Sequence, residues 1–404
     1  MQNSVMLADT AETAGGREVP VIIAHRGNTR GPRKELENTL PYIQDAIAQG
    51  FDVEVDVWSI DGQLFFGHDE PEIPIEPSFL DQYAGNLWCH AKNVHALAYL
   101  LSRRDVLRSF SHDIDPHVIT SDGRIWTYPG RELVKGAISV MPERSDHQTG
   151  IWNCYGICTD FATLYATYVE MRTRNRKKLV GHRTKKESDY INPLIVDKLL
   201  HHTLIDERRC LAVYTYYDDF APTPAWSALN TYLAKELGNQ NIYDVAGPIS
   251  FVHWTFMQIL GFEQWEEHSA TFACHQSKYL AILREEMATL LPLTIKWSGL
   301  VAVSTGLVML GYPSVDVNIW RQRIESRLEK EGLPFRRYQN DIVHSTILRL
   351  SADVSPEHLI AASDAWQDVF FGTLTVSKFQ VGRSSWRMQP TECVTVDVVE
   401  NNGR

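Results

Sequence analysis

The chain has 404 residues, and at about 100 to 200 residues per domain this length predicts two or three domains. Hydrophobic residues make up 44% and charged residues 22% of the chain, which excludes collagen-like, coiled-coil and disordered proteins. The 39 Lys and Arg residues face 50 Asp and Glu residues, and the net charge of -11 argues against a broad surface that coats nucleic acid. A small anionic substrate held by a local basic cluster is compatible with this charge.

The cysteines and the apolar segments predict a soluble protein of the cytoplasm. The six cysteines lack the C-x2-C spacing of a structural zinc site, so we expect thiols in a reducing compartment. Residues 1–19 are polar and acidic where a signal peptide needs a basic end and an apolar run, and we interpret them as a flexible leader. The most apolar window, residues 290–310, includes Pro292 and Lys296 and is too polar for the ~20 residues that span a bilayer.

Short apolar runs separated by turns and short helices begin at Val19. Strands are predicted over residues 21–25, 52–59, 63–69, 86–92, 117–122, 136–142 and 155–161, and a helix over residues 37–50. Such strands with helical returns predict a parallel sheet or barrel whose functional groups lie at the carboxyl ends of the strands. Residues 20–168 are few for a (β/α)8 barrel of about 250 residues, so several helices must be reduced to loops.

A basic run of low hydrophobicity, residues 172–186, follows this region. We interpret residues 169–190 as a solvated linker, with an anion-binding arm as the alternative. Residues 191–404 predict an α+β domain. Its strands are expected within 208–217, 249–260, 293–304, 306–313, 340–350 and 379–389, and its helices within 226–238, 276–291, 318–332 and 356–372.

Polar residues follow several of the apolar runs in the first half. Residues i and i+2 of a strand share a face, so Glu54 and Asp56 present two carboxylates together, as at a cation site. His25 and His68 suit proton transfer at neutral pH. Arg26 offers a planar fork for phosphate oxygens. His112, Asp115 and Glu143 also lie near strand ends and are further candidates for the pocket wall.

These residues resemble the glycerophosphodiester phosphodiesterase family, a group of TIM-type barrels. The family motifs HRG, ENT, E-x-D, DG and HD match, in order, His25-Arg26-Gly27, Glu37-Asn38-Thr39, Glu54-Val55-Asp56, Asp61-Gly62 and His68-Asp69. The family's last strand often reads GI-x-TD, as residues 156–160 do. The resemblance implies that His25 and His68 are the acid/base pair, that Arg26 holds the phosphate, and that Glu54 and Asp56 bind Mg²⁺, Mn²⁺ or Ca²⁺. Glu37 and Asn38 are as compatible with capping and support as with direct contact.

One departure concerns the cation. The family usually has E-x-K on the next strand, whereas this chain has His90-Ala91-Lys92. Lys92 is retained for the phosphate, but an imidazole takes the place of the third metal-binding carboxylate. A softer and neutral ligand weakens Mg²⁺ and Ca²⁺ and favours Mn²⁺ or another transition metal. The alternative is a barrel that binds no metal.

Two H-x-T motifs occur in the second half, each inside an apolar run. His253 and Thr255 must share one face of a strand, and His344 and Thr346 must do the same. The pair resembles the 2H phosphoesterase superfamily, which implies two pseudo-symmetric sheets, one histidine as base, the other as acid, and a phosphate held by both Thr side chains. No metal cofactor is implied for this domain. The alternative is two histidines buried in the core.

Together these patterns predict a compact α/β TIM-type barrel followed by an α+β 2H phosphoesterase domain. The predicted function is a two-domain phosphodiesterase that acts on small phosphodiesters or nucleotides, including cyclic phosphates and RNA ends. The rival hypothesis is a nucleotide- or phosphate-binding regulatory protein whose barrel is catalytically dead.

Overall fold

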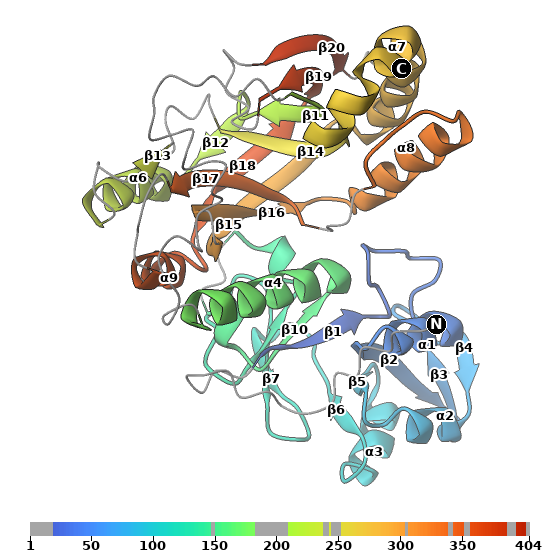
Figure 1. Ribbon diagram of the computed structural model, residues 1–404. Coiled ribbons are helices and arrows are strands. Elements are labelled where there is room, and N and C mark those ends of the chain that lie inside the picture. Colours follow the sequence, from blue (N-terminus) through green and yellow to red (C-terminus); the bar gives the residue numbers. More distant parts are fainter. Residues whose placement is uncertain are drawn as a thin grey trace. The chain divides into compact units, whose positions relative to one another are not determined.

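The computed structural model describes residues 19–146, 150–181, 209–236, 242–243, 252–303, 306–337, 342–350, 356–385 and 393–400 (Figure 1). The predicted leader lies outside these residues except for Val19. The chain divides into two compact units, Met1–Thr173 and Arg174–Arg404. Within the described ranges, no helix combines the length and the apolar character needed to cross a membrane.

Parallel strands form the body of the first unit. Among its described residues, seven strands pair in parallel in the spatial order β6 (Arg108–Phe110), β5 (Leu87–Ala91), β2 (Asp52–Ile60), β1 (Val21–His25), β10 (Gly156–Thr159), β9 (Ile138–Val140) and β8 (Ile125–Thr127). The register places His25 beside Glu54, and Asp56 beside His90. The carboxyl ends of β1, β2 and β5 therefore gather polar residues that are distant in the sequence.

Shorter strands extend this sheet by antiparallel pairing. β3 (Gln63–Phe66) pairs with β2 and β4 (Ile73–Ile75), and β7 (His117–Ile119) pairs with β8. The backbone N–H of Ser121 donates to the carbonyl of Ser109 at 2.7 Å, which links the segment after β7 to β6. This bond links β6 to the segment between β7 and β8, while the closed barrel stays a prediction.

Helices and buried side chains cover one face of these strands. The described helices of this region are α1 (Leu40–Ala48), α2 (Pro77–Gln82), α3 (Val94–Ser102) and α4 (Ala162–Gly181), with short 3-10 turns at Pro142–Arg144 and Ile151–Asn153. Central parallel strands are buried on both faces. On β2 the side chains of Val53, Val55 and Val57 pack in the cluster that contains residues of α1 and α3. Glu54 and Asp56 point to the opposite face.

Helix α4 occupies much of the segment predicted to be a solvated linker. The prediction is wrong for residues 169–181, which are helical, while residues 182–190 lie outside the described ranges. Arg and Lys favour helices, and the run has no Pro, so its basic composition does not prevent a helix. The division into two units falls within this helix, between Thr173 and Arg174.

Two antiparallel sheets form the second unit. One has the order β14 (His253–Leu260), β11 (Cys210–Tyr216), β19 (Lys378–Ser384) and β20 (Val394–Glu400). The other has the order β12 (Phe220–Pro222), β18 (Phe370–Val376), β15 (Leu293–Val303), β16 (Gly306–Pro313), β17 (His344–Leu350) and β13 (Ile242–Tyr243). Although β14 and β17 belong to different sheets, they contact each other.

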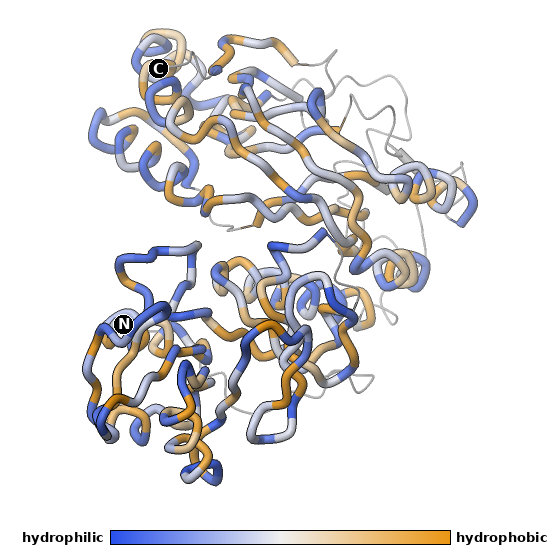
Figure 2. The backbone as a smooth tube through the Cα atoms, turned by 180° about the vertical axis from the view of Figure 1, so that it is seen from behind, coloured by the Kyte–Doolittle hydropathy of each residue, from blue (hydrophilic) through white to orange (hydrophobic). Residues whose placement is uncertain are grey.

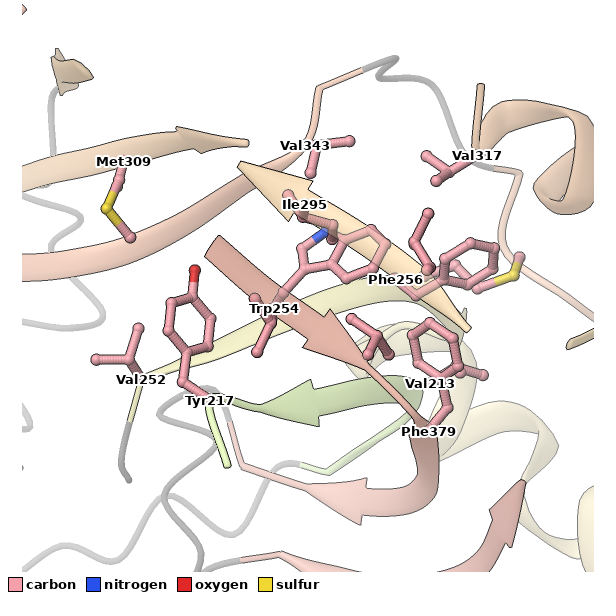
Figure 3. Packing of buried hydrophobic residues seen from close by; sticks show 14 of the residues in the cluster. Val213, Tyr217, Val252, Trp254, Phe256, Ile295, Met309, Val317, Val343 and Phe379 are labelled. Carbon is pink, nitrogen blue, oxygen red and sulfur yellow. The ribbon is translucent and has the colours of Figure 1, made fainter. Parts of the chain in front are cut away.

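The core of this unit contains residues from both sheets and from the helices. Figure 3 shows Trp254 and Phe256 of β14 with Val213 and Phe379 of the same sheet, and Ile295 of the other sheet. The described helices are α6 (Pro224–Glu236), α7 (Phe262–Leu290), α8 (Asn318–Lys330) and α9 (Pro356–Ala365). Helices α7 and α8 pack on each other, and α9 packs on β15. Hydrophobic and hydrophilic residues alternate around these helices, as expected for one buried and one exposed face (Figure 2).

Several described elements of the second unit differ from the sequence prediction, among them the short strands β12 and β13, which were not predicted. Helix α7 begins at Phe262, 14 residues before the predicted start at 276. The helix predicted over 356–372 ends at Ala365, and Phe370 begins strand β18. Strand β20 was not predicted, although its sequence VTVDVVE is rich in β-branched residues.

Candidate active sites

Charged side chains meet at the carboxyl ends of β1, β2 and β5 in the first unit. Glu54 is 3% and Asp56 0% exposed. Glu54, Asp56 and His90 each offer one ligand atom, and these three atoms lie within 4.8 Å of one another. The structure therefore brings together the three residues assigned to a cation on the basis of the resemblance.

Asp56 is surrounded by donors. Its Oδ2 accepts a hydrogen bond from Asn38 Nδ2 at 3.0 Å and lies 2.9 Å from Arg26 Nε. Its Oδ1 lies 3.0 Å from His90 Nδ1 and 3.5 Å from Lys92 Nζ. Burial raises the pKa of this carboxyl, but the hydrogen bond with His90 and the charge of Arg26 outweigh burial and hold the pKa well below its usual range. Asp56 is therefore an anion at neutral pH.

His25 lies between two carboxylates. Its Nδ1 is 2.7 Å from Asp160 Oδ1, and its Nε2 is 3.9 Å from Glu54 Oε2. Burial lowers the pKa of His25, but the hydrogen bond with Asp160 and the charge of Glu54 raise it above the ordinary value overall. His25 is therefore a good proton donor near neutral pH.

His68 stands apart from this buried cluster. Its side chain is 42% exposed, and its Nδ1 contacts Asp69 Oδ1 at 2.7 Å. Partial burial and the positive charge of Arg26 lower the pKa of His68. A lowered pKa favours a neutral imidazole that can accept a proton.

Within the set Glu54, Asp56 and His90, two buried atoms have no hydrogen-bond partner among the described residues. They are Glu54 Oε2 and His90 Nε2. Burial and the neighbouring charge of Asp56 raise the pKa of Glu54, which a nearby cation would reverse. A carboxylate oxygen and an imidazole nitrogen without hydrogen-bond partners are suitable ligands for a divalent transition metal, so the residues present fit such an ion.

The further wall candidates have different surroundings. His112 stacks on Tyr128 with ring centroids 3.6 Å apart, and its own ring lies 6.3 Å from that of His90. Asp115 is exposed. Glu143 is half-buried, and its Oε1 accepts hydrogen bonds from Thr159 Oγ1 and from the backbone N–H of Asp160. Burial raises the pKa of Glu143 to about 7.

The sequence indicated no role for Asp160 or Asn28, and it left Glu37 as either a supporting group or one in direct contact. Asn28 Nδ2 donates to both Glu37 Oε1 and Asp160 Oδ1, each at 2.9 Å. Arg26 Nη1 donates to Glu37 Oε2 at 3.1 Å. Glu37 therefore supports Arg26 rather than facing the cation. The signal for Asp160 was its place directly after the apolar strand β10.

In the second unit each H-x-T motif places its two polar side chains on the same side of a strand. His253 and Thr255 are half-buried, and Trp254 between them is fully buried. His344 and Thr346 are likewise half-buried, and Ser345 between them is 1% exposed. Each His and its Thr thus share one partly accessible face, which disagrees with the alternative of two core histidines.

A β-bulge follows each motif at the same position. In β14 the pairing with β11 skips Phe256, three residues after His253. In β17 the pairing with β16 skips Ile347, three residues after His344. A bulge turns the strand and re-aims its side chains. The two motifs are therefore alike in backbone as well as in sequence.

The two motifs also meet in space. Ser345 Oγ donates a hydrogen bond to the backbone carbonyl of His253 at 2.7 Å. Tyr216 of β11 pairs with His253 of β14, and the two ring centroids lie 6.3 Å apart in an edge-to-face arrangement. The motif backbones therefore lie side by side where β14 contacts β17.

Comparison with known proteins gives weak likenesses. No family model and no curated protein matches the chain. The crystal structure of TT0787 of Thermus thermophilus is 18% identical over 49% of this chain and 99% of that chain, with a TM-score of 0.30. E. coli LigT, crystallised in complex with NADP+, is 15% identical over 49% of this chain and 100% of that chain, with a TM-score of 0.28. Neither likeness is close enough to define the fold or the activity of this chain.

Proposed function

We propose that the chain is a phosphodiesterase whose second unit cleaves phosphodiesters between two histidines. The observation that carries this proposal is the repeated motif: two H-x-T segments with the same burial and the same bulge, joined by the hydrogen bond from Ser345 to His253. The coincidence of sequence, backbone and position is more than two unrelated core histidines would require.

The chemistry follows from the side chains that share the accessible face. A neutral histidine removes a proton from the attacking hydroxyl, and a protonated histidine delivers one to the leaving oxygen. The hydroxyls of Thr255 and Thr346 donate hydrogen bonds to the phosphate oxygens as their charge grows. This reaction suits 2',3'-cyclic nucleotide phosphates and RNA ends, because the net charge of -11 disfavours longer nucleic acid.

A second candidate activity belongs to the first unit. His25 with its raised pKa is the proposed acid, and His68 with its lowered pKa is the proposed base. Arg26 and Lys92 are the proposed phosphate-binding groups. Glu54, Asp56 and His90 would hold a divalent cation, which when bound supplies positive charge for the phosphate.

Both carboxylate oxygens of Asp56 already have donor partners, which favours a regulatory alternative for this unit. Arg26, Lys92, His90 and Asn38 already contact both of its oxygens. A carboxylate with this many partners is stable without a cation. In this alternative the first unit binds a phosphate or nucleotide without cleaving it.

The test uses the full chain, two substrates and a chelator. Turnover of 2',3'-cyclic AMP and of bis(p-nitrophenyl) phosphate is measured for the wild type, His25→Ala and His253→Ala. The proposal predicts that His253→Ala abolishes turnover of 2',3'-cyclic AMP. It also predicts that chelator does not change the wild-type turnover of this substrate. It also predicts a second activity that His25→Ala abolishes and chelator suppresses until Mn²⁺ is restored. Binding of phosphate without a His25-dependent activity supports the regulatory alternative, and cyclic AMP turnover that survives His253→Ala contradicts the main proposal.

A further inference from the structure

Ser345 is a polar residue at a position that is apolar in the other motif. It lies between His344 and Thr346 and is 1% exposed, whereas its counterpart Trp254 is a fully buried aromatic residue. A hydroxyl in a protein core destabilises the fold unless it is hydrogen-bonded. Its partners therefore indicate what Ser345 contributes.

Ser345 belongs to a chain of two short hydrogen bonds. Its Oγ donates to the carbonyl of His253 at 2.7 Å and lies 2.7 Å from the hydroxyl of Tyr217. A serine hydroxyl has a single proton, which the His253 carbonyl receives, so Tyr217 must donate to Ser345. Tyr217 is 1% exposed and directly follows β11. The chain of bonds therefore connects the four-stranded sheet to β17 of the six-stranded sheet.

We propose that Ser345 and Tyr217 are positioning residues that fix the separation of the two proposed catalytic histidines. The inference rests on the proposed function of the second unit. The backbone carbonyl of His253 accepts the hydrogen bond from Ser345, and His344 directly precedes Ser345 in the chain. One hydrogen bond and one peptide unit therefore connect the two histidine backbones. Proton transfer requires each imidazole within hydrogen-bond reach of its oxygen, and small displacements slow it steeply.

The test compares four single variants of the full chain with 2',3'-cyclic AMP as substrate. Ser345→Ala removes the bond to His253 and should lower kcat by about 10- to 100-fold, with a change in KM of less than about threefold. Tyr217→Phe leaves the bond to His253 in place and should lower kcat less. Ser345→Thr retains the hydroxyl and should keep at least about a third of the wild-type kcat. The matched control is Ser363→Ala, because Ser363 of α9 also donates to a backbone carbonyl, that of Leu300 on β15, which is separated from β17 by β16.

A double variant separates positioning from general stability. If Ser345 acts through His253, then Ser345→Ala should cause little further loss of kcat in the His253→Ala background. A merely structural serine would lower the melting temperature of both backgrounds and leave kcat near wild type below that temperature. A wild-type kcat for Ser345→Ala, or full additivity with His253→Ala, overturns the proposal.

A second readout keeps this inference separate from the proposed activity. The pKa values of His253 and His344 can be followed by NMR with ring-labelled histidine, each assigned with its own His→Gln variant. Coupled titrations predict that His344→Gln shifts the pKa of His253, and that this shift shrinks in Ser345→Ala. If the wild type does not cleave cyclic AMP but the shift behaves in this way, the activity is wrong and the positioning stands. An unchanged shift in Ser345→Ala contradicts the positioning.

Discussion

At the scale of single residues, Asp160 shows how a contact sets the protonation of a histidine. It accepts a hydrogen bond from Asn28 Nδ2 and lies 2.7 Å from His25 Nδ1. A bond at Nδ1 fixes the orientation of the ring and leaves Nε2 directed at Glu54, 3.9 Å away. Asp160 is therefore a positioning residue for the proposed acid.

We expect Asp160→Asn to impair the first unit through His25. The variant keeps the shape of the side chain but removes the negative charge that raises the pKa of His25, so this pKa should fall. Any His25-dependent activity should decrease by about 10²-fold or more, and its pH profile should shift to lower pH. An unshifted profile would show that Asp160 does not act on His25.

Glu143 gives a pH dependence of stability whose sign can be worked out. Its pKa is raised to about 7 in the folded chain, so between its unfolded value near 4.5 and pH 7 the folded state binds more protons. Stability therefore falls as pH rises through this range, by about 3 kcal/mol in total for this group. Glu143→Gln retains the hydrogen bonds at Oε1 and should match the wild type near pH 4.5 and exceed it above pH 7 in urea unfolding. Parallel stability curves for the two proteins would contradict this.

The sequence could identify the groups that carry chemistry, but not all of their partners. Glu54 and Asp56 follow from alternation along one strand, and His25 from its place at the end of an apolar run, whereas His90 was assigned through the family resemblance. Asp160 is 135 residues from His25, and only the pairing of β1 with β10 brings the two together. Such long-range partners depend on strand order, which local patterns do not specify.

At the scale of elements, the predicted strands were more accurate than the helices and the linker. β1, β2, β5 and β16 lie within one or two residues of their predicted limits, because alternating or continuous apolar runs are short and bounded by turns. The run at 356–372 combines a helical start with a strand, and tertiary pairing with β15 decides where the strand begins. The basic run in α4 shows that charge alone is a poor indicator of a linker.

Gly67 directly follows strand β3 and precedes His68, so its backbone conformation sets where His68 lies. An added Cβ there would lie 2.0 Å from the Glu70 carbonyl oxygen, and the Gly67 carbonyl accepts a hydrogen bond from Trp58 Nε1 at 2.7 Å. We therefore expect Gly67→Ala to displace His68 and to destabilise the full chain by about 2 kcal/mol or more. The matched control is Gly62→Ala, since Gly62 also has a positive φ, of 83°, but has no atom near its added Cβ. Equal unfolding midpoints for the two variants would refute the steric argument.

At the scale of the whole molecule, the boundary between the units decides which fragments fold. The division between Thr173 and Arg174 leaves the end of α4 in the second unit. There Leu179 is buried in the core cluster, and Arg176 Nη1 lies 2.7 Å from Asp364 Oδ1. A fragment that begins at residue 190, at the end of the predicted linker, would lack both contacts.

We therefore expect the fragment 174–404 to be more stable than the fragment 190–404. Loss of a buried leucine costs about 2 to 5 kcal/mol, which is a large part of the stability of a domain. Thermal unfolding and cyclic AMP turnover of the two fragments provide the measurement. If the shorter fragment is as stable and as active as the longer one, the end of α4 does not belong to the functional unit.

The most direct test of the central claim is the pH profile of 2',3'-cyclic AMP turnover. It is measured for the wild type, His253→Ala and His344→Ala, each with and without chelator. We predict a bell-shaped wild-type profile that chelator does not change, because one histidine must be neutral and the other protonated. Each single variant should lose about 10²- to 10⁴-fold in kcat and the corresponding limb of the bell, and the double variant should lose little more than either one. Near-normal turnover by both single variants would contradict the account and return His253 and His344 to a structural role.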